Sequence, residues 1–367
     1  MSDEFRDLLR KVGSGKHTSK VLSRAEAARA GELMLRQEAT PAQIGAFMIA
    51  HRIKRPTGEE LAGILDAYNL LGPRLAPIES EFGPIILNSP YDGRARTAPI
   101  RPLTTLILAA AGCPVISHGG DRMGTKYGIP FSQIWRELGV EWSHLELDQV
   151  QQIFEQTYIG FLYTPKLFPL AAGLVDYRNQ IGKRPPLATI ELIWKPYKGK
   201  ALVAAGFVHP PTESTAQEAL TRHKTQQFIM VKGLEGSCDL SRDRTCIMGK
   251  GPGPVDEETG QPTVERLFLR SIDYGYKHKD VPLNSDTDFI AQLTSVLAGN
   301  LNEEWTHQLM QSAVWNGGFY LWQSGICSDM ESGLAQAQKL LEDGSALAKL
   351  KALQEAIQAL SQVNAAL

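Results

Sequence analysis

The apolar run Cys113-Pro-Val-Ile116 leads directly into the polar, glycine-rich run Ser117-His-Gly-Gly-Asp-Arg-Met-Gly-Thr-Lys126-Tyr-Gly128. A short buried strand that ends in such a loop is typical of an α/β sheet. The same order occurs upstream, where Pro84-Ile-Ile-Leu87 is followed by Asn88-Ser-Pro-Tyr-Asp-Gly93. Because ligands of open α/β sheets bind at the carboxyl ends of the strands, both loops are candidate binding loops.

Further apolar runs extend this alternation through the middle of the chain. We expect strands at 158–162, 202–207 and 228–231, and helices at 103–111, at 129–138 and from Trp305 onward. The run 249–260 is rich in glycine and proline and predicts a turn-rich excursion. Strands that alternate with helices predict an α/β fold with a mainly parallel central sheet covered on both faces.

The first 72 residues differ, because they carry helix signals only. Ser23 with Glu26, and Thr57 with Glu60, have capping-box spacing, and Thr40 precedes a proline at the first position of a helix. The sequence therefore predicts a small N-terminal α-helical domain over 1–72, joined by helices from about 165–185. A large α/β domain is expected over 84–367.

The composition is that of an ordinary globular protein, since 43% of the 367 residues are hydrophobic and 21% are charged. No apolar run is long enough to suggest a membrane span, and the polar N-terminus does not resemble a secretory signal. The four cysteines show no metal-binding spacing. Reduced thiols and a cytoplasmic location are expected.

The charge is uneven although the net charge is only −2. Residues 1–250 hold 31 Lys and Arg against 25 Asp and Glu, a balance of +6, whereas residues 251–367 hold 7 against 15, a balance of −8. One interpretation is scattered, solvated charge. The other is a basic face that attracts phosphates or a nucleic-acid backbone.

Four segments together resemble the anthranilate phosphoribosyltransferase family (glycosyltransferase family 3), which is related to the pyrimidine nucleoside phosphorylases. These segments are Ala39-Thr-Pro-Ala-Gln-Ile-Gly-Ala-Phe47, Gly160-Phe-Leu-Tyr-Thr-Pro165, Tyr177-Arg-Asn-Gln-Ile-Gly-Lys-Arg184 and Gln311-Ser-Ala-Val-Trp-Asn-Gly-Gly-Phe-Tyr320. The resemblance covers nearly the whole chain. It implies a cleft between the helical and α/β domains, and a homodimer formed through the helical domain. Members of the family transfer a phosphoribosyl group from phosphoribosyl pyrophosphate to anthranilate and use magnesium.

Matches to the family's loops, together with the three arginines that stand in place of its Asn-Ile-Ser-Thr run, indicate where phosphates and substrate bind. The candidate residues are Asp92, Gly93, Arg94, Arg96, Arg101, His118, Gly119, Lys126, Gly128, Arg178 and Arg184. No catalytic residue is assigned. For His118 the alternative is a structural histidine, for Lys126 a solvated loop lysine, and for Arg178 and Arg184 surface charge at a helix end.

Magnesium is implied through the run Lys232-Gly-Leu-Glu235-Gly236. The family has an adjacent Asp-Glu pair at this place, and only one carboxylate, Glu235, is present here. Magnesium keeps several waters and binds through one or two carboxylates, so a single ligand predicts a weakened Mg²⁺ site.

The chain departs from the family in both binding loops. The glycines before Asp92, the Asn-Ile-Ser-Thr run and the Lys-His-Gly-Asn run of the family are absent. One hypothesis is a divergent transferase that moves a phosphoribosyl group to an aromatic or heterocyclic acceptor, with anthranilate transfer very weak or absent. The other is a catalytically inactive protein on the same fold that binds phosphates of single-stranded DNA or RNA.

Overall fold

The protein is described by a computed structural model that covers residues 2–15, 17–256 and 262–365, with the backbone alone over 361–365. Its first four helices are α1 (Asp3–Gly13), α2 (Arg24–Leu35), α3 (Pro41–Lys54) and α4 (Gly58–Leu71). Helices α2, α3 and α4 begin where the sequence predicts. The side chains of Ser23, Thr40 and Thr57 each accept a hydrogen bond from the backbone three residues later, and a capping box is complete at all three.

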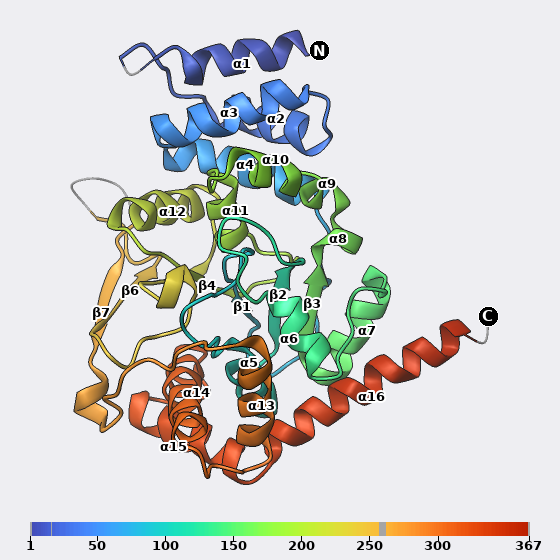
Figure 1. The fold of residues 1–367 in the computed structure, drawn as a ribbon. Helices are drawn as coiled ribbons and strands as arrows, with labels where there is room; N and C mark the ends of the chain where they lie inside the picture. Colours follow the sequence, from blue (N-terminus) through green and yellow to red (C-terminus); the bar gives the residue numbers. More distant parts are fainter. Residues whose placement is uncertain (1, 16, 257–261, 366–367) are drawn as a thin grey trace.

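A seven-stranded sheet forms the centre of the remaining chain (Figure 1). Its strands are β1 (Ile85–Leu87), β2 (Val115–Gly119), β3 (Ile159–Tyr163), β4 (Leu202–Gly206), β5 (Gln227–Val231), β6 (Cys246–Gly251) and β7 (Glu265–Leu269). The order is β3-β2-β1-β4-β5-β6-β7, in which the first five strands are parallel and β6 and β7 are antiparallel. The predicted fold class, a small helical domain with a larger, mainly parallel α/β domain, is confirmed.

Helices cover the sheet on both sides. The helices after β1 are α5 (Arg101–Ala110), α6 (Phe131–Glu137), α7 (Leu147–Thr157), α8 (Thr164–Leu167), α9 (Pro169–Ala172), α10 (Val175–Ile181), α11 (Leu187–Ile193), α12 (Pro210–Arg222), α13 (Asp286–Leu297), α14 (Glu304–Gln323), α15 (Met330–Glu342) and α16 (Ser345–Ala365). Two short 3₁₀ turns, η1 (Leu234–Gly236) and η2 (Ser271–Tyr274), complete the described elements. None of the described helices is long and apolar enough to cross a membrane.

The N-terminal helices rest on the α/β part through α12 and α10 (Figure 1). Helix α4 packs against α12, and α10 contacts α3. Arg24 reinforces the first contact, since it pairs with Asp66 of α4 and donates from Nη1 to the carbonyl of Arg222 at 2.9 Å. The domain boundaries between 72 and 84 stay a prediction.

The prediction of a turn-rich segment over 249–260 is wrong for residues 249–251, because these residues complete β6. This strand pairs antiparallel with β5, and Gly251 lies opposite Phe228. A Cβ on Gly251 would approach the Phe228 ring to 2.4 Å, so a glycine that predicts a turn is here required by close packing. Residues 257–261 lie outside the described part of the chain.

A buried carboxylate organises the helical region. Glu60 is 0% exposed and accepts hydrogen bonds from the amides of Leu22 and Thr57 at 2.9 and 2.8 Å, and from Lys54 Nζ at 2.8 Å. Burial raises its pKa, but His51, the Leu22 amide and Lys54 outweigh burial and lower the pKa to about 2. This one side chain therefore ties the entry to α2 to the turn between α3 and α4.

Candidate active site

Three loops meet at the carboxyl ends of the parallel strands. They follow β1, β2 and β5, and β1 lies between β2 and β4, where the direction of the strand order reverses. The first two loops are joined by the amide of Gly128, which donates to the Asp92 carbonyl at 3.0 Å, and by the amide of Ile129, which donates to the Arg94 carbonyl at 2.9 Å. The candidate loops of the sequence therefore form one surface at the switch point of the sheet, where α/β proteins bind ligands.

Gly93 and Gly128 make this loop contact sterically feasible. Gly93 has φ +70°, and a Cβ there would lie 2.5 Å from the Ile129 carbonyl oxygen. A Cβ on Gly128 would lie 2.4 Å from the Arg94 carbonyl oxygen. Both glycines therefore allow the two loops to approach each other closely. Gly119 is the last residue of β2 and lies opposite Tyr163 of β3.

The side chain of Glu235, in η1 after β5, occupies the centre of this surface. Its Oε1 accepts hydrogen bonds from the amides of Arg96 and Thr97 and from the Thr97 hydroxyl, each at 3.0 Å. The Ala95 amide approaches Oε2 at 3.4 Å. Three consecutive amides that point to one carboxylate form an anion-binding loop, and the chain's own Glu235 is the anion it holds.

Three cations surround the same carboxylate. Lys126 Nζ lies 3.2 Å from Oε2, Arg96 Nε lies 3.7 Å from it, and Arg94 Nε lies 3.9 Å from Oε1. Arg94 is buried and also pairs with Asp239. Arg96 is different, because 79% of its side chain is exposed. The structure thus brings the predicted Arg94, Arg96 and Lys126 together, around an internal counter-ion.

Glu235 should make the stability of the protein depend on acidity. Burial raises its pKa, but Lys126 and the amides of Arg96 and Thr97 outweigh burial and lower the pKa from 4.5 to about 2. A lowered pKa gives stability that is complete above pH 4.5 and is lost as pH falls toward 2. A shift of this size corresponds to about 3 kcal/mol.

This dependence can be measured by urea unfolding of the wild-type protein and of Glu235→Gln at pH 6 and pH 3. The gap in unfolding free energy between the two proteins should shrink at pH 3. A gap that is equal at both pH values would assign the pH dependence to other groups.

Asp92 and Arg184 form a second ion pair beside this cluster. Arg184 donates from Nε and Nη2 to the two carboxylate oxygens of Asp92, both at 2.8 Å, and the Asp92 side chain is 1% exposed. Burial and the neighbouring Arg184 lower the pKa of Lys126, while Glu235 and Asp92 act in the opposite direction. The two ion pairs are therefore electrostatically coupled, and Arg184 is not simple surface charge.

His118 and Arg101 are buried beneath the loops. The Tyr91 hydroxyl and His118 Nδ1 are 2.5 Å apart, and burial followed by the charge of Arg101 lowers the pKa of His118 to about 3. Arg101 donates to the Leu87 carbonyl at 3.1 Å, and its guanidinium lies 3.7 Å from the centre of the Phe131 ring. His118 is therefore a neutral, buried side chain, and Arg101 is fixed between the Leu87 carbonyl and the Phe131 ring. Both support the loops from below, which agrees with the interpretation of His118 as a structural histidine.

A cavity of about 200 Å³ lies next to the loop cluster, between α4, α10 and α11. It is lined by Tyr68, Tyr91, Gly120, Asp121, Arg122, Met123, Thr164, Pro165, Ala171, Ala172, Leu174, Val175, Arg178, Leu187 and Glu191. Arg178 Nη1 donates to Glu191 Oε1, and both side chains are buried. The sequence interpretation missed Glu191, although a single carboxylate inside the apolar run Ile190–Ile193 is the signal that could have found it.

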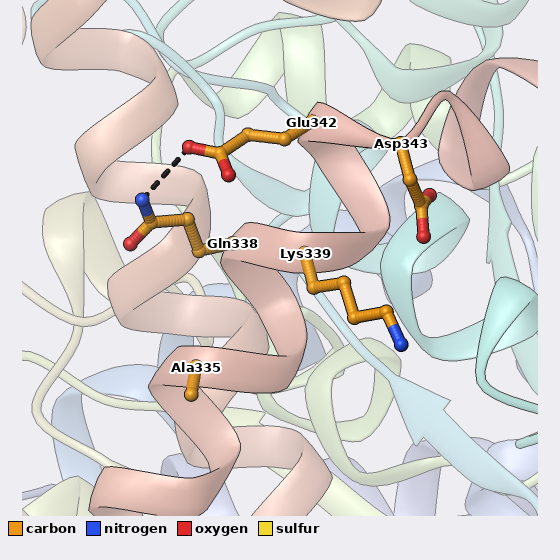
Figure 2. Close-up of a pocket in the computed structure, with 5 residues that line it drawn as sticks. All are labelled: Ala335, Gln338, Lys339, Glu342 and Asp343. Atoms are coloured by element: carbon orange, nitrogen blue, oxygen red, sulfur yellow. Dashed lines mark hydrogen bonds between the residues drawn. The ribbon is translucent and has the colours of Figure 1, made fainter.

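A second hollow, on α15, does not belong to this site. Figure 2 shows it lined by Ala335, Gln338, Lys339, Glu342 and Asp343. All five come from one helix and its end, and Gln338 donates to Glu342 one turn away at 2.8 Å. These contacts are typical of a solvated helix surface, so this hollow is not a candidate active site, whereas the loops at the strand ends are.

The donors around Glu235 do not fit a divalent cation in this arrangement. Oε1 accepts from amides and a hydroxyl, and Oε2 contacts Lys126, so the surroundings are positive where a metal needs negative ligands. In the described residues no group of three His, Cys, Asp or Glu side chains is close enough to hold a metal. A metal role for Glu235 stays a prediction.

The helical bundle and the mainly parallel α/β part each match a domain of one known family. Residues 6–69 match the helical bundle domain of a glycosyl transferase family, and residues 94–347 match the a/b domain of that family. The chain belongs to this glycosyl transferase family, which confirms the resemblance inferred from its motifs.

Curated relatives match over nearly the full length. An anthranilate phosphoribosyltransferase of Natronomonas pharaonis is 25% identical over 355 residues, which cover 96% of this chain and 99% of the relative. One of Azorhizobium caulinodans is 26% identical and covers 99% and 100%. A solved anthranilate phosphoribosyltransferase of Saccharomyces cerevisiae, in complex with PRPP and Mg, shares the fold with a TM-score of 0.77 at 14% identity, covering 97% and 98%.

Proposed function

We propose that the protein is a glycosyltransferase that moves a phosphoribosyl group from phosphoribosyl pyrophosphate to an aromatic or heterocyclic acceptor. The acceptor nitrogen forms a bond to ribose C1 as the bond from C1 to the diphosphate oxygen breaks. The diphosphate leaves with the electron pair, and the acceptor proton passes to solvent. The names of the full-length relatives support this reaction class.

The observation that carries the proposal is the anion held by the loop after β1. The amides of 95–97 and Lys126 Nζ converge on the Glu235 carboxylate, and phosphate oxygens would use the same donors once that side chain moves away. Backbone amides and cations that face a leaving diphosphate stabilise the charge that develops on it. We assign Arg96, Lys126 and the amides beside them to the diphosphate.

The cavity between α4, α10 and α11 is the proposed acceptor site. It adjoins the first loop through Tyr91 and the loop after β2 through Asp121. The Asp92–Arg184 pair links the segment after α10 to the same loop.

Calorimetry with phosphoribosyl pyrophosphate, with and without Mg²⁺, tests the proposal. We expect binding that weakens at least about 10-fold when Arg96 and Lys126 are both changed to Ala, because two charged contacts are lost. The arm with Mg²⁺ tests the predicted metal role of Glu235 separately: binding that is stronger with Mg²⁺ in the wild type but not in Glu235→Ala would mean that the carboxylate leaves the amides of 95–97 to hold the metal. Unchanged binding by the double variant would show that this loop pair is not the donor site.

A nucleic-acid backbone is the alternative ligand, favoured by the 79% exposed side chain of Arg96 at the rim of the loops. The internal pairing of Arg94, Arg178 and Arg184 with carboxylates leaves fewer cations for a phosphate backbone. A short single-stranded oligonucleotide in the same calorimeter distinguishes the two. Its affinity should fall steeply with salt if phosphates are contacted, and salt-independent binding would contradict this alternative.

Anthranilate itself is expected to be a very poor acceptor. Loss of one positioned donor in a charge-stabilising site costs roughly 100- to 1000-fold in rate, and several donors of the family loops are absent from this sequence. Expression in a tryptophan auxotroph that lacks its own anthranilate phosphoribosyltransferase measures this directly. Robust growth on minimal medium would contradict the expectation.

The homodimer and the cytoplasmic location belong to the same proposal. Ile53 of α3 and Leu70 of α4 are 76% and 66% exposed, which supports a contact through the helical domain. Light scattering of the purified protein tests the dimer. The cysteines Cys113, Cys238, Cys246 and Cys327 are all free thiols, as a cytoplasmic protein would keep them, and fractionation of cells tests the location.

A further inference from the structure

A histidine at the end of α12 accepts a hydrogen bond from α4. His223 follows the last residue of α12, and its Nε2 lies 2.8 Å from Nδ2 of Asn69. The other end of the Asn69 amide is fixed, because its Oδ1 accepts from Trp194 Nε1 at 3.2 Å and an indole nitrogen can only donate. Asn69 therefore presents its NH₂ group to His223. Nε2 can accept from this group only without a proton, so His223 is neutral and carries its proton on Nδ1.

A second partner for His223 lies one turn away on α4. Asp66 Oδ1 is 3.4 Å from His223 Nε2, and the same carboxylate accepts two hydrogen bonds from Arg24. A protonated Nε2 would face the donor group of Asn69, which is unfavourable, and would be attracted to the Asp66 carboxylate. Protonation should therefore move the His223 ring from Asn69 to Asp66.

The surroundings of His223 favour its neutral form. The charged groups that face it are Asp66 of α4, Arg24 of α2, Arg74 after α4 and Lys195 after α11, besides the Arg222–Glu218 pair on α12. Burial lowers the pKa of His223 below its ordinary value of 6.5, Asp66 opposes burial, and the cations Arg24, Lys195 and Arg74 act with it. A histidine with a lowered pKa gives stability that is complete above pH 6.5 and is lost as the pH falls below this value.

Trp194 connects this contact to the candidate site. Its side chain is 0% exposed, its ring centre lies 4.9 Å from that of His118, and its carbonyl accepts from Asn88 Nδ2 at 3.0 Å. Asn88 begins the loop after β1, and His118 lies near the end of β2. Trp194 therefore supports both binding loops. Once His223 leaves Asn69, the Asn69 amide can turn, and a turned amide places a donor against Trp194 Nε1.

We propose that His223, Asn69 and Asp66 form an acid-sensitive switch, in which uptake of a proton by His223 Nε2 transfers the ring from Asn69 to Asp66 and loosens Trp194 and the two loops. The proton comes from solvent, since 26% of the His223 side chain is exposed. The switch depends on the packing of α4 against α12 and on no ligand. It therefore holds or fails independently of the proposed transfer reaction.

Hydrogen–deuterium exchange of the full-length protein at pH 8 and pH 5 tests the switch. His223→Gln is the decisive variant, because glutamine also offers an acceptor to Asn69 but takes up no proton in this range. We expect the Trp194 indole N–H and the amides of 88–97 and 117–128 to exchange equally in both proteins at pH 8. At pH 5 they should exchange at least about 10-fold faster in the wild type, because one lost hydrogen bond accounts for that factor.

Three further variants separate the switch from a general effect of acid. His144→Gln, at an exposed histidine, is the control and should exchange like the wild type at both pH values. Asn69→Ala removes the donor that opposes protonation, so the pKa of His223 measured by NMR should rise, whereas Asp66→Asn removes the favourable charge and should lower it.

Equal exchange in the wild type and His223→Gln at pH 5 would overturn the proposal. So would a pKa of His223 that does not rise in Asn69→Ala. If His223→Gln does not fold, the opposite pKa shifts in Asn69→Ala and Asp66→Asn still decide.

Discussion

Glu235→Ala should raise the affinity of the metal-free protein for inorganic phosphate by at least about 10-fold. In the wild type the Glu235 carboxylate occupies the amides of 95–97, so phosphate binds only to the fraction of molecules in which that side chain has moved away. Removing the carboxylate frees the amides and Lys126 together. Isothermal titration with phosphate in the presence of a chelator measures the change.

The exposed Glu79→Ala is the control for loss of one negative charge, and its phosphate affinity should equal that of the wild type. Added affinity in Glu235→Ala that disappears when Lys126 is also changed to Ala would locate the phosphate at this loop. If phosphate binding by Glu235→Ala stays at the wild-type level, the amides are not an anion site and the donor half of the proposed function fails with them.

Glu60→Ala should lower the free energy of unfolding by about 3 to 5 kcal/mol, because it leaves a buried cation without its partner. Lys54 Nζ lies 2.9 and 2.8 Å from the two Glu60 oxygens, and its side chain is only 10% exposed. The amides of Leu22 and Thr57 lose their acceptor at the same time. Thermal or urea unfolding followed by circular dichroism measures the loss.

Glu59→Ala, at the adjacent position, is a close control. The Glu59 side chain is 41% exposed, accepts one hydrogen bond from the Arg24 amide at 3.3 Å and lies 4.0 Å from Arg222, so its removal should cost about 1 kcal/mol at most. Equal losses for both variants would show that burial of Glu60 contributes nothing beyond an ordinary surface charge.

Local rules predict the fold well because they operate within a few residues. The caps at Ser23, Thr40 and Thr57 need only the next three residues, and strands β1 to β5 coincide with short apolar runs. Strand β7 cannot be predicted by such local rules, because most of its residues are exposed, including Phe268 at 63%. Its position depends on pairing with β6 rather than on its own apolar pattern.

The candidate site is predicted less completely, because pairing partners are distant in sequence. The positions of Arg94 and Lys126 on neighbouring loops follow from the order of strands. The pairing of these cations with Asp239 and Glu235 cannot be predicted in this way, because the two carboxylates lie on the loop after β5, far away in sequence. The pairing of Arg178 with Glu191 likewise needs α10 and α11 to be placed side by side. From the sequence alone, Arg94, Lys126 and Arg178 look like unpaired cations, whereas in the fold each of them is paired with a carboxylate.

The strand order has a consequence for how the site assembles during synthesis. Strand β1 pairs with β2 on one edge and with β4 on the other, and Ile85 lies opposite Leu202 of β4. The second edge of β1 therefore stays unpaired until the ribosome has synthesised β4. Contacts that distant in sequence form late, after local helices such as α2 and α4. Glu235 is later still on the ribosome than either strand. A nascent chain therefore presents the amides of 95–97 uncovered until the last parallel strand is followed by its loop.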